Sequence, residues 1–99
     1  MDISLLSANN FNALLNAVFT IKFSEGIEHG AELISVTEFS GYSPLQRTPF
    51  SLVFRTQQKN EYYEQGIFTV THPEEGNLEL FLTPLGFDEV GMKYEAVFS

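Results

Sequence analysis

The 99-residue sequence contains no cysteine and no tryptophan. The absence of cysteine excludes disulfide bonds, thiolate metal sites, iron–sulfur clusters and cysteine nucleophiles. Basic residues are also few: five Lys and Arg stand against thirteen Asp and Glu, which gives a formal net charge of −8. Because this charge repels phosphate backbones and anionic lipid surfaces, we expect neither nucleic acids nor membranes as partners.

The first part of the chain also lacks the features of a targeting segment. No basic residue precedes Lys22, and no long apolar run is present. A cleaved signal peptide needs a basic start and an apolar stretch, and a membrane span needs a longer apolar stretch still. We therefore expect a cytoplasmic protein.

Aromatic side chains, in contrast, are abundant. Ten Phe and four Tyr make up 14% of the residues, within a hydrophobic content of 43%. Such side chains suit the half-buried, pleated surface of a β-sheet. The length is that of one domain with one core, so we expect a single β-rich domain over residues 1–99.

One short helix is predicted near the N-terminus. Phe11, Leu14, Leu15 and Val18 follow the i, i+3, i+4, i+7 spacing of an apolar helix face. Asn9 or Asn10 is placed to act as the N-cap residue. The helix has to end by Val18, where strict alternation begins.

Six later segments carry the pattern of β-strands. We predict a loop over Ser24–Gly30, a tight turn over Pro73–Gly76, and a closing hairpin whose two strands are joined across Pro84–Gly91. The fold class is therefore mainly β: about six antiparallel strands in a strongly bent sheet or small barrel, with one short N-terminal α-helix. The predicted strands are Val18–Phe23, Ala31–Phe39, Thr48–Arg55, Gly66–His72, Leu78–Thr83 and Lys93–Phe98. In the last two strands we expect the core contacts to come from Leu80, Leu82, Tyr94, Ala96 and Phe98.

The ordinary acid–base candidates are two histidines, His29 and His72. Glu25, Glu28 and Glu32 lie near His29, but a glycine-containing loop does not place them on one face, so we favour a solvated loop over a metal site. For His72 we favour a hydrogen-bonded side chain at the sheet's rim over a general base. We accordingly predict no catalytic residue, no metal and no cofactor, and a protein that is not an enzyme. A hydrolase using His29 or His72 is a remote alternative.

Recognition by surface side chains is the remaining class of function. Tyr42, Arg47, Tyr62 and Tyr63 are residue types that carry interface energy, and they lie in the two polar connections on either side of Phe50–Arg55. We predict that these residues bind a partner. The alternative is that each Tyr covers the edge of the core and keeps its hydroxyl in water.

Four segments of the second half of the chain form a recognisable set: Pro49–Arg55, Gly66–Phe68 with His72, Leu80–Gly86 and Tyr94–Phe98. Together they resemble a small bacterial domain family of unknown function. Members of that family typically end in a Phe-Leu-x-Pro-Ile-Gly run and a Tyr-x-Ala-Val-Phe-Asn terminus. This chain has Leu85 in place of the Ile and Ser99 in place of the Asn.

The resemblance implies a type of neighbouring gene but no mechanism. Members of the family often lie beside genes for phage-tail-collar-like fibre proteins, which implies an accessory or assembly role and no catalytic residue. We therefore predict a non-enzymatic protein-interaction or assembly module with an unidentified protein partner. A small-ligand-binding β-barrel is the alternative, and self-association into a homo-oligomer stays open.

Overall fold

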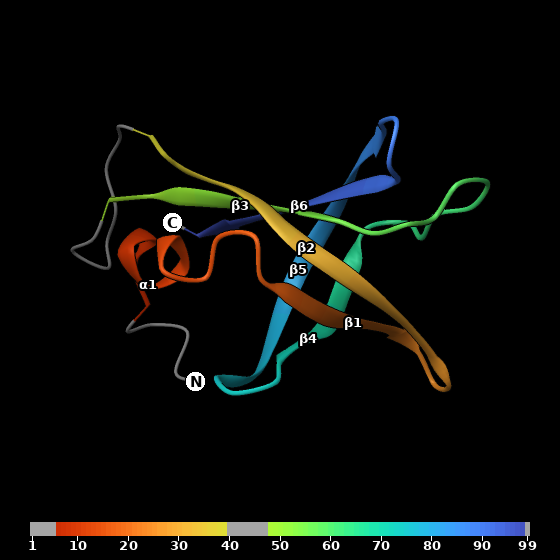
Figure 1. Ribbon diagram of the computed structural model, residues 1–99, viewed down its shortest axis with the longest axis horizontal. Helices are drawn as coiled ribbons and strands as arrows, with labels where there is room; N and C mark the ends of the chain where they lie inside the picture. Colours follow the sequence, from red (N-terminus) through yellow and green to blue (C-terminus); the bar gives the residue numbers. More distant parts are fainter. Residues whose placement is uncertain (1–5, 40–47, 99) are drawn as a thin grey trace.

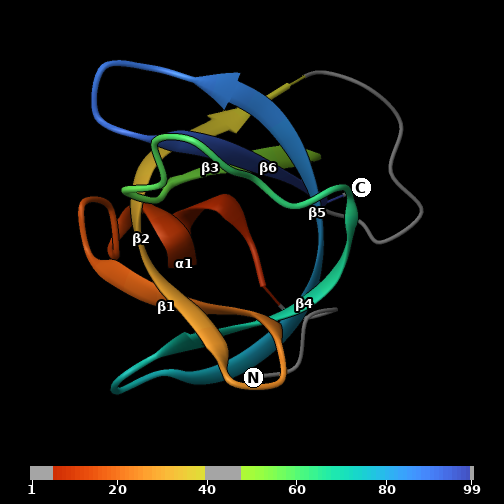
Figure 2. The ribbon, with the colours of Figure 1, turned by 90° about the vertical axis from the view of Figure 1, so that its right-hand side faces the viewer.

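Six strands close into a barrel in a computed structural model that describes residues 6–39 and 48–98. Around the barrel the strand order is β1-β2-β3-β6-β5-β4, and all neighbours, including β4 and β1, are antiparallel (Figure 1, Figure 2). The predicted fold class is confirmed. The elements are α1 (Ala8–Asn12), β1 (Val18–Ser24), β2 (Ile27–Glu38), β3 (Phe50–Arg55), β4 (Gly66–His72), β5 (Gly76–Phe87) and β6 (Met92–Phe98).

The order of the strands combines local and distant pairing. β1 pairs with β2 and β2 with β3, which gives a first group of three strands. In the same way β4 pairs with β5 and β5 with β6, which gives a second group. The two groups are then joined by β1 with β4 and by β3 with β6, where Phe50 faces Phe98 and Arg55 faces Lys93. Between the groups, residues 56–65 connect β3 to β4 without regular structure.

The closing hairpin differs from the one predicted. β5 runs on to Phe87, its first part paired with β4 and its second part with β6. The prediction of a connection beginning at Pro84 is wrong, because a register shift between Pro84 and Gly86 keeps this proline inside the sheet. Proline is tolerated at such an irregularity, where the missing N–H disrupts no regular ladder. Only residues 88–91 separate β5 from β6.

The predicted loop over Ser24–Gly30 is also wrong. β1 ends at Ser24 and β2 begins at Ile27, so the turn between them is only two residues long. Gly26 has a φ of +79°, which glycine adopts without steric cost. His29 therefore lies on a strand, opposite Ile21.

α1 is shorter than predicted and is capped differently. Ser7 is the N-cap residue, and its backbone N–H donates to Oδ1 of Asn10 at 2.8 Å, so Asn10 supports the cap instead of forming it. The chain leaves the helix early because it joins β2: Asn16, with a φ of +73°, donates its N–H to the carbonyl of Leu33. Among the described residues, no helix is long and apolar enough to cross a bilayer.

Aromatic side chains close both ends of the barrel. At one end Phe11 of α1 lies 5.9 Å from Phe50 and 5.5 Å from Phe98, measured between ring centroids. Seen along the barrel, α1 lies within the ring of strands (Figure 2). At the other end Phe23 contacts Tyr63 and Tyr94. The predicted core residues of the last two strands are all buried: Leu80, Leu82, Tyr94, Ala96 and Phe98.

Gly91 directly precedes β6 and lies so close to the backbone that follows β3 that no side chain fits there. A Cβ at this position would lie 1.8 Å from the carbonyl oxygen of Thr56 and 2.9 Å from Cα of Gln57. Because both neighbours are backbone, we expect Gly91→Ala to lower the free energy of unfolding by about 3 kcal/mol or more, the upper end of overpacking costs. Chemical denaturation measures this.

Gly30→Ala is the matched control, because a Cβ there would meet only Cγ1 of Val18 at 3.5 Å. We expect this variant to unfold within about 0.5 kcal/mol of the wild type. Equal stability of the two variants would contradict the close approach at Gly91.

Candidate interaction surface

Two of the four residues predicted to bind a partner can be placed. Tyr42 and Arg47 lie outside the described residues. Tyr62 and Tyr63 are neighbours in the connection between β3 and β4, but their side chains have different surroundings. Tyr62 is 50% exposed, whereas Tyr63 is partly buried against the core.

Tyr63 closes the end of the barrel. Its ring stacks on Phe23, with centroids 4.6 Å apart and an interplanar angle of 11°. Its backbone N–H donates to the hydroxyl oxygen of Tyr94 at 3.1 Å. These two contacts fix the connection on the barrel and leave the neighbouring Tyr62 on the outside.

A buried polar chain fixes the start of the same connection. The hydroxyls of Tyr94 and Thr56 both donate to Oε1 of Gln58, each at 2.8 Å. All three residues are buried, and burial raises the pKa of the Tyr94 hydroxyl. Buried polar groups that are hydrogen-bonded in this way hold a segment in one conformation. The connection is therefore anchored on both sides of residues 59–62.

Tyr62 forms one wall of an apolar hollow on the outer surface. Its ring meets the ring of Phe87 edge-on at a centroid distance of 6.2 Å and an angle of 84°. The hollow has a volume of about 310 Å³, and Leu85 and Phe87 in its lining are 48% and 46% exposed. We call it the Tyr62 hollow; it is lined by Tyr62, Pro84, Leu85, Gly86, Phe87 and Met92.

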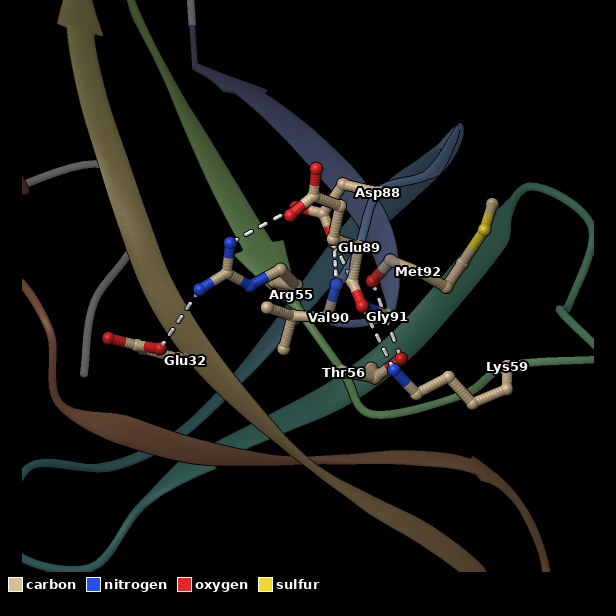
Figure 3. A network of polar contacts seen from close by, with 9 residues as sticks. All are labelled: Glu32, Arg55, Thr56, Lys59, Asp88, Glu89, Val90, Gly91 and Met92. Atoms are coloured by element: carbon tan, nitrogen blue, oxygen red, sulfur yellow. Dashed lines mark hydrogen bonds and ion pairs between the residues drawn. The ribbon is translucent and has the colours of Figure 1, made fainter.

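The turn that follows Phe87 is held by a charged network (Figure 3). Arg55 on β3 donates from Nη1 to Oδ2 of Asp88 at 3.0 Å, and its Nη2 lies 3.5 Å from Oε1 of Glu32 on β2. The other oxygen of Asp88 accepts the backbone N–H groups of Val90 and Gly91 at 2.8 and 2.9 Å. The hydrogen bond from Gly91 is the largest cause of a lowered pKa of Asp88. Together with the hydrogen bond from Val90 and the nearby Arg55, it lowers this pKa to about 2.

A further contact joins the two walls of the hollow. Nζ of Lys59 donates to the backbone carbonyl of Glu89 at 3.1 Å, which connects the segment carrying Tyr62 to the turn beside Phe87 (Figure 3). Both aromatic walls thus stand on segments that are fixed by hydrogen bonds. A preformed hollow of this kind loses little conformational entropy when it is filled.

Two further exposed apolar side chains lie on β5, before Leu85, and on its neighbour β4. Phe81 of β5 is 53% exposed and Ile67 of β4 is 69% exposed, and the two are direct partners across the β4–β5 ladder. Sequence reasoning missed this pair together with Leu85 and Phe87. The available signal was alternation: Phe81 stands between Leu80 and Leu82, on the face where a solvated strand carries polar residues.

The two histidines lie at different places. Nδ1 of His72 accepts the N–H groups of Glu74 and Glu75, both at 3.1 Å, so this buried ring closes the β4–β5 turn. His29 packs edge-on against Phe23, 5.7 Å away between ring centroids. Within residues 6–39 and 48–98, no three His, Asp or Glu side chains converge as a set that could hold a metal ion.

A second, polar hollow lies beside the Arg55 network. It has a volume of about 400 Å³, and its lining includes Glu28, His29, Glu32 and Arg55. The Arg55 guanidinium there is already occupied by two carboxylates. Both hollows are outside the barrel, whose interior is filled by one cluster of buried hydrophobic side chains.

These features define the class of protein: a small, closed, six-stranded antiparallel barrel with a helix across one end and an apolar hollow at the other. The chain belongs to the family described as Domain of unknown function (DUF6916), whose family model matches residues 6–98. No curated protein and no solved structure matches the chain. The predicted membership in a family of unknown function is confirmed, and the link to fibre proteins stays a prediction.

The Asp88 network predicts a specific loss of stability in acid. Because the folded pKa of about 2 lies below the ordinary 3.8, Asp88 contributes fully above pH 3.8 and loses its contribution as the pH falls towards 2. We expect Asp88→Asn to be less stable than the wild type at pH 5, with the difference shrinking between pH 4 and 2. Urea unfolding at each pH measures the difference.

Val90→Ala is the control, because it alters the same turn and keeps the Asp88 carboxyl. It should retain the acid dependence of the wild type. A wild-type advantage over Asp88→Asn that stays constant from pH 5 to pH 2 would show that Asp88 is not stabilised as described.

Proposed function

We propose that this domain is a non-enzymatic protein-interaction module. Its docking surface consists of the Tyr62 hollow and the exposed pair of Ile67 on β4 and Phe81 on β5, the strand that also carries Leu85 and Phe87. The observation that carries the proposal is that large apolar side chains gather here, about half exposed or more, without contributing to the core. The docking surface is defined by Tyr62, Ile67, Phe81, Leu85 and Phe87.

Physical chemistry favours a partner at such a surface. Grouped apolar side chains, in contrast to scattered ones, mark interaction sites on soluble proteins. Covering them gains about 25 cal/mol per Å² of apolar area removed from water. Aromatic rings in a preformed hollow are also the side chains that most often dominate binding energy.

The family resemblance supports an assembly role for this module. We propose that the partner is a component of a tail-fibre-like particle, which the domain assists or joins. An assembly factor of this kind needs a stable fold and a recognition surface, and it needs no catalytic group.

The proposal is tested by recovering a partner from the native host. A tagged domain should retain a stoichiometric protein in mild salt, and Tyr62→Ser combined with Phe87→Ser should weaken that retention at least about tenfold, the effect of losing about 1.4 kcal/mol. Circular dichroism checks that the variant folds. Quantitative pull-down at several bait concentrations measures the affinity.

Val18→Ser is the matched control, because it removes an apolar side chain that is 60% exposed on β1 and outside the docking surface. It should bind like the wild type. Repeated absence of a stoichiometric partner, or equal loss of binding in both variants, would count against the proposal.

A further inference from the structure

Carboxylates flank the docking surface at both of its ends. Glu61 directly precedes Tyr62, and Glu89 follows Phe87 by two residues. At the other end Glu79 precedes Phe81 by two residues on the same strand. All three are exposed. The apolar centre therefore has an acidic border.

Within residues 6–39 and 48–98, none of these three carboxylates forms an ion pair. The ion pairs of the described residues join Lys22 to Glu25 and Arg55 to Glu32 and Asp88, so none of them involves the acidic border. Lys59 is near by, but its ammonium donates to the backbone carbonyl of Glu89. The charge at the border is part of a formal net charge of −8 for the chain.

We infer that the occupant of the docking surface is a segment of another protein that carries Lys or Arg on both sides of its apolar anchor residues. This inference rests on the proposed function. Along β5, the six residue-to-residue steps from Phe81 to Phe87 span about 20 Å at the usual strand rise. A short linear segment can cover that length and place a basic side chain near the carboxylates at each end, where opposite charge steers and selects a partner.

The same charges oppose two other occupants. A second copy of this chain would bring its own acidic border against the first and would add a like net charge. A membrane bearing anionic lipids would be repelled in the same way. Both occupants are outcomes that the experiment below distinguishes.

The test uses three synthetic 16-residue peptides and the isotope-labelled full chain. The first peptide carries Phe and Leu anchors flanked by Lys, the second has the same anchors flanked by Glu, and the third carries Lys with the anchors replaced by Ser. Amide chemical shifts are followed during each titration at low and high salt. The first peptide should shift the docking-surface amides and bind at least about tenfold more tightly than the others, with the advantage over the Glu peptide shrinking as salt rises.

Paired charge variants test the source of the selectivity. Glu61→Gln combined with Glu79→Gln should weaken binding of the Lys-flanked peptide several-fold and reduce its salt dependence. The control, Glu38→Gln with Glu75→Gln, removes the same charge at the α1 end of the barrel, where Glu38 pairs with Phe50 and Glu75 lines a hollow with Asn10. It should leave binding unchanged.

Each of the remaining outcomes contradicts the inference, and each indicates a different explanation. If the Lys- and Glu-flanked peptides bind the docking surface equally, the basic partner is wrong and the proposed function stands. If no peptide shifts these amides, or the Lys peptides shift acidic sites over the whole barrel, the surface does not select a basic apolar segment. A concentration-dependent mass without peptide would indicate a second copy, and binding to neutral phosphatidylcholine vesicles would indicate a membrane.

Discussion

The pairing of β6 with β3 is the constraint on which the rest of the structure depends. It joins β6 to a strand about forty residues earlier in the chain, with Phe50 opposite Phe98 and Arg55 opposite Lys93. Three further contacts follow the same alignment: Gly91 against the Thr56 carbonyl, Asp88 with Arg55, and the Tyr94 hydroxyl with Gln58. Without this pairing the barrel would open into one six-stranded sheet with β3 and β6 as its exposed edges.

The same constraint creates the proposed docking surface. Because β3 pairs with β6, the chain has to cross the end of the barrel to begin β4, and residues 56–65 form that crossing. The crossing is held inward by Tyr63 and Gln58, which leaves Tyr62 beside Phe87. The proposed docking surface therefore includes an irregular segment that the topology requires, and hydrogen bonds and ring contacts hold this segment on the barrel.

Much of the fold could be predicted because alternation is a local property. The bounds of β4 agree with the prediction, and the core positions of β5 and β6 are buried as expected. The errors lie where the local pattern is ambiguous. Pro84 and Gly86 are typical turn residues, yet an irregular register keeps them in a strand. Glu28 and Gly30 resemble a loop, yet pairing with β1 places them in β2.

The docking surface was harder to predict than the fold. Tyr62 was identified by residue type, but its neighbour Phe87 lies in a segment that was predicted to be a connection. Only the pairing of β3 with β6 brings the turn after Phe87 to Arg55. Ile67 and Phe81 were missed because exposed and buried apolar residues look alike in a short strand. Only the alternation of Phe81 with the core residues Leu80 and Leu82 indicates that its side chain lies on the opposite face.

The central claim is that the docking surface serves a partner and not the fold. Comparing the free energies of unfolding of Phe81→Ser and Leu80→Ala tests it most directly, because the two residues are neighbours on β5, one exposed and one buried. The account predicts a loss below about 1 kcal/mol for Phe81→Ser, the range of a single cross-strand pair. For Leu80→Ala it predicts a loss of about 2–5 kcal/mol. Equal losses for the two variants would show that the exposed side chains stabilise the barrel, and would contradict the account.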